Sequence, residues 1–156
     1  SRQKIADRFN SAFNQINGIT TPVVKENCSH SYYFYAMKLD EENLGVSKFT
    51  IADALIAEGC VGIMPRYINL HLYPMYQRKI AFGASGYPWS GAARREIDYR
   101  KGICPVSEEL NDKSFLGIFM CASEFSKDEV KSTINAFLKV FENINLLRDY
   151  ERSINV

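Results

Sequence analysis

Apolar residues recur at helical spacing in three stretches of the chain. Residues 2–16 carry the first pattern, with apolar side chains at intervals of four, four and three positions: Ile5, Phe9, Phe13 and Ile16. Residues 47–59 carry the second, which opens with Ser47 as N-cap, stops at Gly59 and includes Phe49, Ala52, Leu55 and Ile56. Each pattern predicts a helix with one face on a hydrophobic core.

The third helical pattern closes the chain. Ser126 and Glu129 have the spacing of a capping box, in which each side chain accepts a hydrogen bond from the other residue's backbone N–H. A long apolar stripe follows at helical spacing: Val130, Ile134, Phe137, Leu138, Phe141, Ile144 and Leu147. The pattern predicts one long amphipathic helix.

Three other stretches have the character of strands. Residues 29–39 alternate between two faces, with Tyr33, Tyr35, Met37 and Leu39 on one and Tyr32, Phe34, Ala36 and Lys38 on the other. Because both faces are apolar near its start, we expect this strand to be central. Short apolar runs over 60–64 and 115–121 predict two more strands, and residues 106–111 a short helix. Strands that alternate with helices at short connections are typical of an α/β sandwich.

Residues 65–104 show no sustained period. The stretch is rich in proline and glycine, and a segment this long and irregular inside a compact domain is usually functional or disordered. Its aromatic side chains favour order, because they supply the burial that ordering requires: Tyr67, Tyr73, Tyr76, Phe82, Tyr87, Trp89 and Tyr99. We expect an ordered loop that faces a ligand or a partner.

Charge is concentrated in the same loop. Nineteen basic and eighteen acidic residues give the chain a net charge of +1, which disfavours a duplex-binding protein. Residues 65–104 hold seven of the basic residues and two of the acidic ones, a local +5, so the rest of the chain carries −4. Such a patch favours an anionic ligand, although chance clustering on a solvated loop explains it equally well.

Composition and cysteine spacing exclude several classes. With 156 residues, 46% hydrophobic and 24% charged, the chain suits one soluble globular domain. No apolar run approaches the roughly 18 residues of a membrane helix, and no signal-peptide core follows the first residues, so we expect a cytoplasmic protein. The four cysteines are widely separated and predict buried thiols rather than a metal site. A Cys104 nucleophile would need a base such as His71, a pairing that free cysteines seldom make.

Five short runs, in this order, resemble a known family. The chain is similar to the C-terminal small domain of the PLP-dependent sugar aminotransferases of the DegT/DnrJ/EryC1/StrS family. Most specific is Tyr-x-x-Leu-His-Leu-x-Pro-x-Tyr followed by Cys-Pro-x-Ser-Glu-x-Leu. The runs that carry the resemblance are 30–33 (HSYY), 57–59 (AEG), 67–76 (YINLHLYPMY), 102–110 (GICPVSEEL) and 126–130 (SKDEV).

The resemblance implies a fold and an activity. The fold would be a small, mostly antiparallel sheet packed by helices, the C-terminal small domain of a fold-type I PLP enzyme, over residues 1–156 with the long loop at 65–104. The full enzyme would move an amino group from an amino-acid donor to a keto-sugar, nucleotide-linked in most cases, or a keto-cyclitol. PLP would be held by a large domain that this chain lacks, and the full enzyme would be a homodimer. The chain alone would hold no catalytic or cofactor-binding residue and would be inactive.

The resemblance also implies which residues contact the substrate. Arg66 would pair with a phosphate, His71 would hydrogen-bond sugar hydroxyls or phosphate, and Tyr67 and Tyr73 would offer phenols and rings to a sugar or base. The family often has glutamine where Tyr73 stands, and a lone histidine between leucines can be purely structural.

Two alternatives stay open. A sister reaction of the same family is PMP-dependent sugar dehydration, which the missing lysine position would distinguish from transamination. A stand-alone binding module would use the basic aromatic loop for a nucleotide, single-stranded nucleic acid or protein. The aromatic spacing carries no ribonucleoprotein signature, so we expect no nucleic-acid partner.

Overall fold

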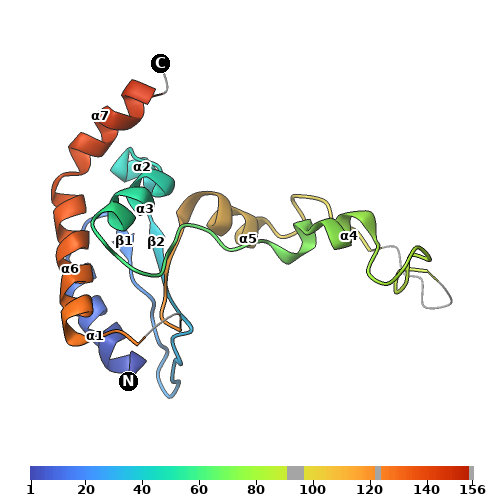
Figure 1. Cartoon of the computed structure of the whole chain (residues 1–156), viewed down its shortest axis with the longest axis horizontal. Coiled ribbons are helices and arrows are strands. Elements are labelled where there is room, and N and C mark those ends of the chain that lie inside the picture. The colour runs from blue at the N-terminus through green and yellow to red at the C-terminus, as the bar shows by residue number, and fades with distance from the viewer. Residues whose placement is uncertain (91–96, 122–123, 155–156) are drawn as a thin grey trace. The chain divides into compact units, whose positions relative to one another are not determined.

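The computed structural model describes residues 1–90, 97–121 and 124–154. They form two compact units: unit 1 comprises Ser1–Arg66 and Lys113–Val156, and unit 2 comprises Tyr67–Asp112 (Figure 1). Unit 2 is thus an insertion between two halves of unit 1. It takes up most of the stretch for which the sequence shows no period.

Unit 1 is built on a small antiparallel sheet. Its strands are β1 (Ile19–Thr20), β2 (Phe34–Leu39), β3 (Ile63–Met64) and β4 (Phe115–Phe119), in the order β1-β2-β4-β3. Tyr35 of β2 lies opposite Ile118 of β4, which in turn lies opposite Ile63 of β3. The fold is α+β, as predicted, and the aromatic strand is central, as predicted.

Helices cover one face of this sheet. They are α1 (Arg2–Phe13), α2 (Glu41–Leu44), α3 (Lys48–Ala57), α6 (Lys127–Glu142) and α7 (Ile144–Ile154), and α6 packs against α1 and α3. The rings of Phe13 and Phe137 stack with centroids 4.3 Å apart, and Tyr35 meets Phe9 edge-on at 5.3 Å. All four side chains are fully buried, so aromatic packing joins the first helix, the sheet and the last helical segment.

The other sheet face carries half-buried rings. Phe34 stacks on Phe119 at 5.1 Å and meets Phe115 edge-on at 6.2 Å. A Cβ at Gly117 would lie 2.8 Å from the Phe115 ring and 2.9 Å from the Phe34 ring, so the close approach of these rings depends on glycine. Both faces of β2 are apolar because one face packs against helices and the other carries aromatic rings.

Several element boundaries differ from the predictions. The single long C-terminal helix was wrong: the chain leaves helical geometry at Asn143, and α6 and α7 are separate. β2 begins at Phe34 rather than residue 29, after Tyr32 with φ +51°, and the 60–64 strand is reduced to Ile63–Met64. The Ser47 N-cap and the Ser126–Glu129 capping box are confirmed.

Gly62 is required by both backbone conformation and space. Its φ is +73°, and a Cβ there would lie 3.0 Å from the carbonyl oxygen of Phe119, whose N–H donates to the Gly62 carbonyl at 2.8 Å. Gly59, with φ +88° and open space around a built Cβ, is a matched control. We expect Gly59→Ala to lower the free energy of unfolding by about 1–2 kcal/mol, the usual cost of left-handed backbone.

Gly62→Ala should cost more than Gly59→Ala, because the β3–β4 contact must also shift. Urea denaturation of both variants followed by circular dichroism measures the difference. Equal losses of unfolding free energy in the two variants would show that the Phe119 backbone shifts at no cost to accommodate the new Cβ.

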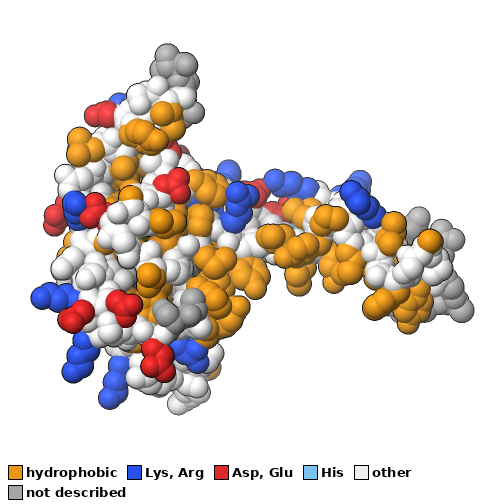
Figure 2. Space-filling view, in the orientation of Figure 1, with side chains coloured by type: hydrophobic (Ala, Val, Ile, Leu, Met, Phe, Trp, Pro, Cys, Tyr) orange, Lys and Arg blue, Asp and Glu red, His pale blue; other side chains and the backbone are white. Residues whose placement is uncertain are grey.

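Unit 2 contains short helices rather than one irregular loop. They are η1 (Leu70–Leu72), α4 (Pro74–Arg78), α5 (Pro105–Glu109) and the start of a π-helical turn, η2 (Leu110–Ser114). Within its described residues only Asn69 and Glu108 are buried, and no hydrophobic side chain is. Figure 2 shows hydrophobic side chains exposed along the unit. Unit 2 is therefore organised by polar contacts and half-buried rings.

Among the helices that the structure describes, none combines the length and apolar character needed to cross a bilayer.

Candidate functional site

The candidate site is the polar network that joins residues 67–71 to α5 and the turn after it. The Tyr67 N–H donates to Asn111 Oδ1 at 2.7 Å. Asn69 Oδ1 accepts from the Ser107 hydroxyl at 2.6 Å and from the Asn111 amide at 3.0 Å. The third connection is between His71 and Glu108. Residues 67, 69 and 71 are thus tied to α5 or the turn after it, while the intervening Ile68 and Leu70 are exposed.

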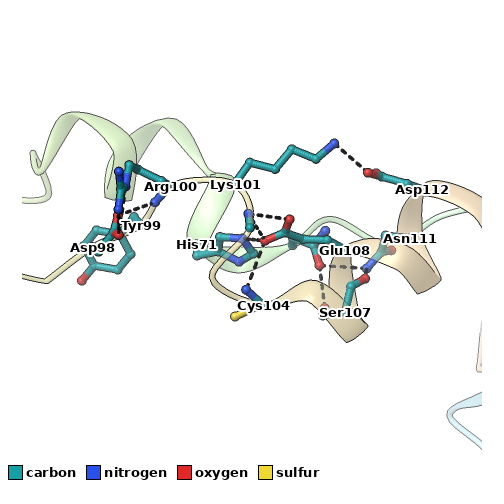
Figure 3. A network of polar contacts seen from close by, with 12 residues as sticks. His71, Asp98, Tyr99, Arg100, Lys101, Cys104, Ser107, Glu108, Asn111 and Asp112 are labelled. Carbon is teal, nitrogen blue, oxygen red and sulfur yellow. Dashed lines mark hydrogen bonds and ion pairs between the residues drawn. The ribbon is translucent and has the colours of Figure 1, made fainter.

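Glu108 is the centre of this network (Figure 3). Its Oε1 lies 2.8 Å from Nε2 of His71, and the two side chains are 7% and 10% exposed. The Gly102 N–H donates to both carboxylate oxygens, at 2.7 and 2.9 Å, and the Cys104 N–H donates to Oε1 at 3.2 Å. One carboxylate therefore holds together the turn before α5 and the histidine of η1.

The surroundings of Glu108 favour its ionised form. Burial acts to raise the pKa of the carboxyl, but the N–H groups of Gly102 and Cys104 and the ring of His71 outweigh burial, so the pKa lies below its ordinary value. An ionised carboxylate accepts hydrogen bonds and donates none. At neutral pH Glu108 is thus a buried anion whose surrounding groups are donors.

The rings of Tyr76, Trp89 and Tyr99 form a cluster within unit 2. The Trp89 indole N–H donates to the Tyr99 hydroxyl at 3.0 Å, and the Tyr76 ring meets both, with centroids at 6.0 and 5.2 Å. The Gln77 side-chain amide donates to the carbonyl oxygens of His71, at 2.7 Å, and Tyr99, at 2.5 Å. Trp89 therefore packs against other rings of unit 2.

Ion pairs reduce the predicted basic character of the loop. Arg100 pairs with Asp98 at 2.8 Å, and Lys101 with Asp112 at 2.7 Å. Arg94, Arg95 and Glu96, which contribute to the predicted patch, lie outside the described residues. The described basic side chains that remain in the stretch are exposed: Arg66, Arg78 and Lys79.

The structure distributes the four predicted substrate contacts between the units. Arg66 belongs to unit 1, where its guanidinium lies 5.2 Å from the centroid of the Phe49 ring. Tyr67 and Tyr73 of unit 2 are 49% and 38% exposed, so part of each residue is accessible to solvent. His71 is the most enclosed of the four. Substrate binding by these residues stays a prediction.

Glu108, Asn69 and Asn111 were missed as functional candidates. Ser107, Glu108 and Asn111 have the spacing of one helix face, and polar residues at 69 and 71 alternate with apolar ones at 68, 70 and 72. The two patterns signal a segment whose polar residues bond to a helix face. Neither pattern shows which helix bonds to residues 67–71, so the contacts of these residues with α5 could be found only in the tertiary structure.

The structure also places the four cysteines and His30. Buried thiols were predicted, but Cys28, Cys104 and Cys121 are exposed, because they lie in connecting segments. Cys60 is buried, and burial together with nearby Glu58 raises the pKa of its thiol to about 11. His71 bonds to Glu108, whose carboxylate also accepts the Cys104 N–H. Nδ1 of His30 accepts the Tyr32 N–H at 2.8 Å and so fixes a loop.

The described residues do not fit a PLP site. PLP enzymes hold a lysine beside the cofactor and a carboxylate against its ring nitrogen. Three cavities of unit 1, of about 720, 440 and 390 Å³, have no lysine among the described residues that line them. Within the described part of the chain, no group of histidine, cysteine and acidic side chains could hold a metal ion.

Two known proteins are similar to this chain in sequence. No family model matches the chain. Spore coat polysaccharide biosynthesis protein SpsC of Bacillus subtilis is 32% identical over 87 residues, which cover 56% of this chain and 22% of SpsC. Uncharacterized protein MJ1066 of Methanocaldococcus jannaschii is 24% identical over 140 residues, 89% of this chain and 31% of that protein.

A solved structure shows the fold. The aminotransferase TlmJ from Streptoalloteichus hindustanus superposes with a TM-score of 0.57 and 21% identity, over 87% of this chain and 30% of TlmJ. The chain thus spans about a fifth to a third of the length of the proteins it matches. It has the fold of part of an aminotransferase and is similar in sequence to a polysaccharide biosynthesis protein.

Proposed function

We propose that this chain is the C-terminal small domain of a PLP-dependent sugar aminotransferase of the DegT/DnrJ/EryC1/StrS type. The observation that carries the proposal is the shared fold, which covers 87% of this chain but 30% of an aminotransferase. The similarity to a polysaccharide biosynthesis protein supports a sugar as the substrate. The substrate would be a keto-sugar, nucleotide-linked in most cases, or a keto-cyclitol.

The role proposed for the chain is substrate binding. The exposed guanidinium of Arg66 suits a phosphate, because it presents paired donors to an oxyanion. In unit 2, the partly exposed Tyr67 and Tyr73 offer phenols and ring faces to a sugar or base. His71 offers a ring nitrogen to a hydroxyl. These contacts bind and orient the substrate and carry out no bond-breaking step.

The chemistry is proposed to belong to a longer protein. PLP supplies the electron sink for amino-group transfer when bound, and a large domain outside this chain would hold it. The partners would be an amino-acid donor, the sugar substrate and a second copy in a homodimer, in the cytoplasm.

The test is the mass of the native polypeptide after borohydride treatment of a cell extract. We expect a polypeptide well above 17.8 kDa that carries a reduced pyridoxyl-phosphate group on a lysine. Extract treated with borohydride after removal of PLP is the control. A native product of 17.8 kDa without the group would overturn the proposal and favour a stand-alone binding module.

A further inference from the structure

Glu108 determines which ring nitrogen of His71 is available for other contacts. The carboxylate faces three donors, the Gly102 N–H, the Cys104 N–H and the His71 ring (Figure 3). Because a carboxylate in this setting has no proton to give, Nε2 of His71 must carry the hydrogen of the 2.8 Å contact. A neutral imidazole with its proton on Nε2 has an unprotonated Nδ1, which accepts hydrogen bonds.

Nδ1 of His71 remains accessible. No hydrogen bond to this atom is found among the described residues. Among the described residues, Ser114 Oγ is the side-chain polar atom that is both closed to solvent and without a hydrogen-bond partner. Nδ1 of His71 has no partner either, so it must be in contact with solvent, although the His71 side chain is only 10% exposed. The imidazole therefore keeps one acceptor atom that has no partner among the described residues and that solvent can reach.

The orientation of the ring is fixed in advance. The Glu108 carboxylate is held by two backbone N–H groups of the turn at 102–104, and it lies on α5, which Asn69 ties to the His71 segment. A ring held in this way loses little freedom when it accepts a further hydrogen bond, which is how a supporting residue contributes to binding.

We infer that Glu108 is a positioning residue: it keeps the His71 proton on Nε2 and directs Nδ1 to accept a hydrogen bond from a hydroxyl of the bound sugar. The sugar part of this inference rests on the proposed function, whereas the tautomer does not. Glu108 touches no substrate and acts through His71.

The first measurement is the tautomer of His71, from ¹⁵N NMR of the full chain at about pH 8.5, where an imidazole is neutral. We expect protonated Nε2 and unprotonated Nδ1. His30 is an internal reference, because its Nδ1 accepts the Tyr32 N–H and its tautomer is fixed without Glu108. The chain has these two histidines, so the variant His30→Gln assigns the signals.

Three variants test the dependence on Glu108. Glu108→Ala should leave His71 as a mixture of tautomers with His30 unchanged. Glu108→Gln should preserve the wild-type tautomer, because an amide oxygen at the Oε1 position still accepts from the His71 ring and the Cys104 N–H. Its NH2 group replaces the oxygen that accepts the Gly102 N–H at 2.7 Å, so Gly102 keeps only its bond to the Oε1 position. If Glu108→Ala opens unit 2, as judged from its amide signals, Glu108→Met fills the same space without an acceptor. Protonated Nδ1 in the wild type, or one unchanged tautomer in the variants without an acceptor, would overturn the inference.

The second measurement is the affinity of the same proteins for UDP-glucose by calorimetry. Loss of one oriented hydrogen bond should weaken binding about three- to tenfold in Glu108→Ala, with affinity restored in Glu108→Gln. Glu109→Ala, at an exposed neighbour on α5, should bind like the wild type. Equal affinity of wild type and Glu108→Ala would overturn the positioning role. Absence of binding by the wild type would contradict the proposed function, while the tautomer result would still decide the role of Glu108.

Discussion

Replacing Phe13 with alanine should lower the free energy of unfolding of unit 1 by about 3–5 kcal/mol, the usual cost of removing a buried phenylalanine ring. Phe13 is fully buried, stacks on Phe137 at 4.3 Å and also contacts Phe9 at 5.3 Å. The lost ring would leave a cavity where α1, α6 and β2 meet. Since domains of this size are stable by only about 5–15 kcal/mol, the variant should be close to unfolding.

Urea denaturation followed by circular dichroism measures this loss. Tyr150→Ala is the matched control, because this aromatic side chain on α7 is 56% exposed and its removal should change stability by about 0.5 kcal/mol or less. A Phe13→Ala protein as stable as the control would show that the packing between α1 and α6 is not the core of unit 1.

The second large effect is expected in unit 2, on replacing Asn69 with alanine. The side-chain oxygen of Asn69 is the shared acceptor of Ser107 and Asn111, and the residue is 8% exposed. Its loss removes the hydrogen bonds from the Ser107 hydroxyl and the Asn111 amide, at a cost of about 0.5–1.5 kcal/mol each. Because no described hydrophobic side chain of unit 2 is buried, the unit has little else to offset this loss, and we expect it to open locally.

Hydrogen exchange resolved by peptide mass spectrometry distinguishes local from global opening. Exchange should rise in residues 67–112 and stay unchanged in β2, β4 and α6. Asn135→Ala, at an exposed asparagine on α6, should leave both units protected. Equal acceleration in both units would show that unit 2 does not open independently of unit 1.

The contrast between these two variants follows from how each unit is built. Unit 1 buries the apolar residues that recur at helical and strand spacing, including Phe9, Phe13, Tyr35 and Phe137. Unit 2 buries Asn69 and Glu108 instead. A change of core volume should therefore act on the first unit, and a change of hydrogen bonding on the second.

Local signals in the sequence determined the elements of unit 1. The Ser47 N-cap and the Ser126–Glu129 capping box are contacts between residues two or three positions apart, so their spacing alone specifies them. The alternation around Tyr35 identified the central strand in the same way. The break at Asn143 was missed because the apolar stripe continues through it into α7.

The tertiary structure alone decided the pairing of His71 with Glu108. The two residues are 37 positions apart, and each is unremarkable in its own segment, a histidine between leucines and one of two adjacent glutamates. Their contact requires α5 to lie along residues 67–71, an arrangement set by Asn69 and Asn111. Periodicity reports which face of an element is apolar, and it carries no information on which polar groups meet across a long separation. The sequence therefore determined the central strand and the main helices of unit 1, while the fold decided which imidazole nitrogen is left to meet a ligand.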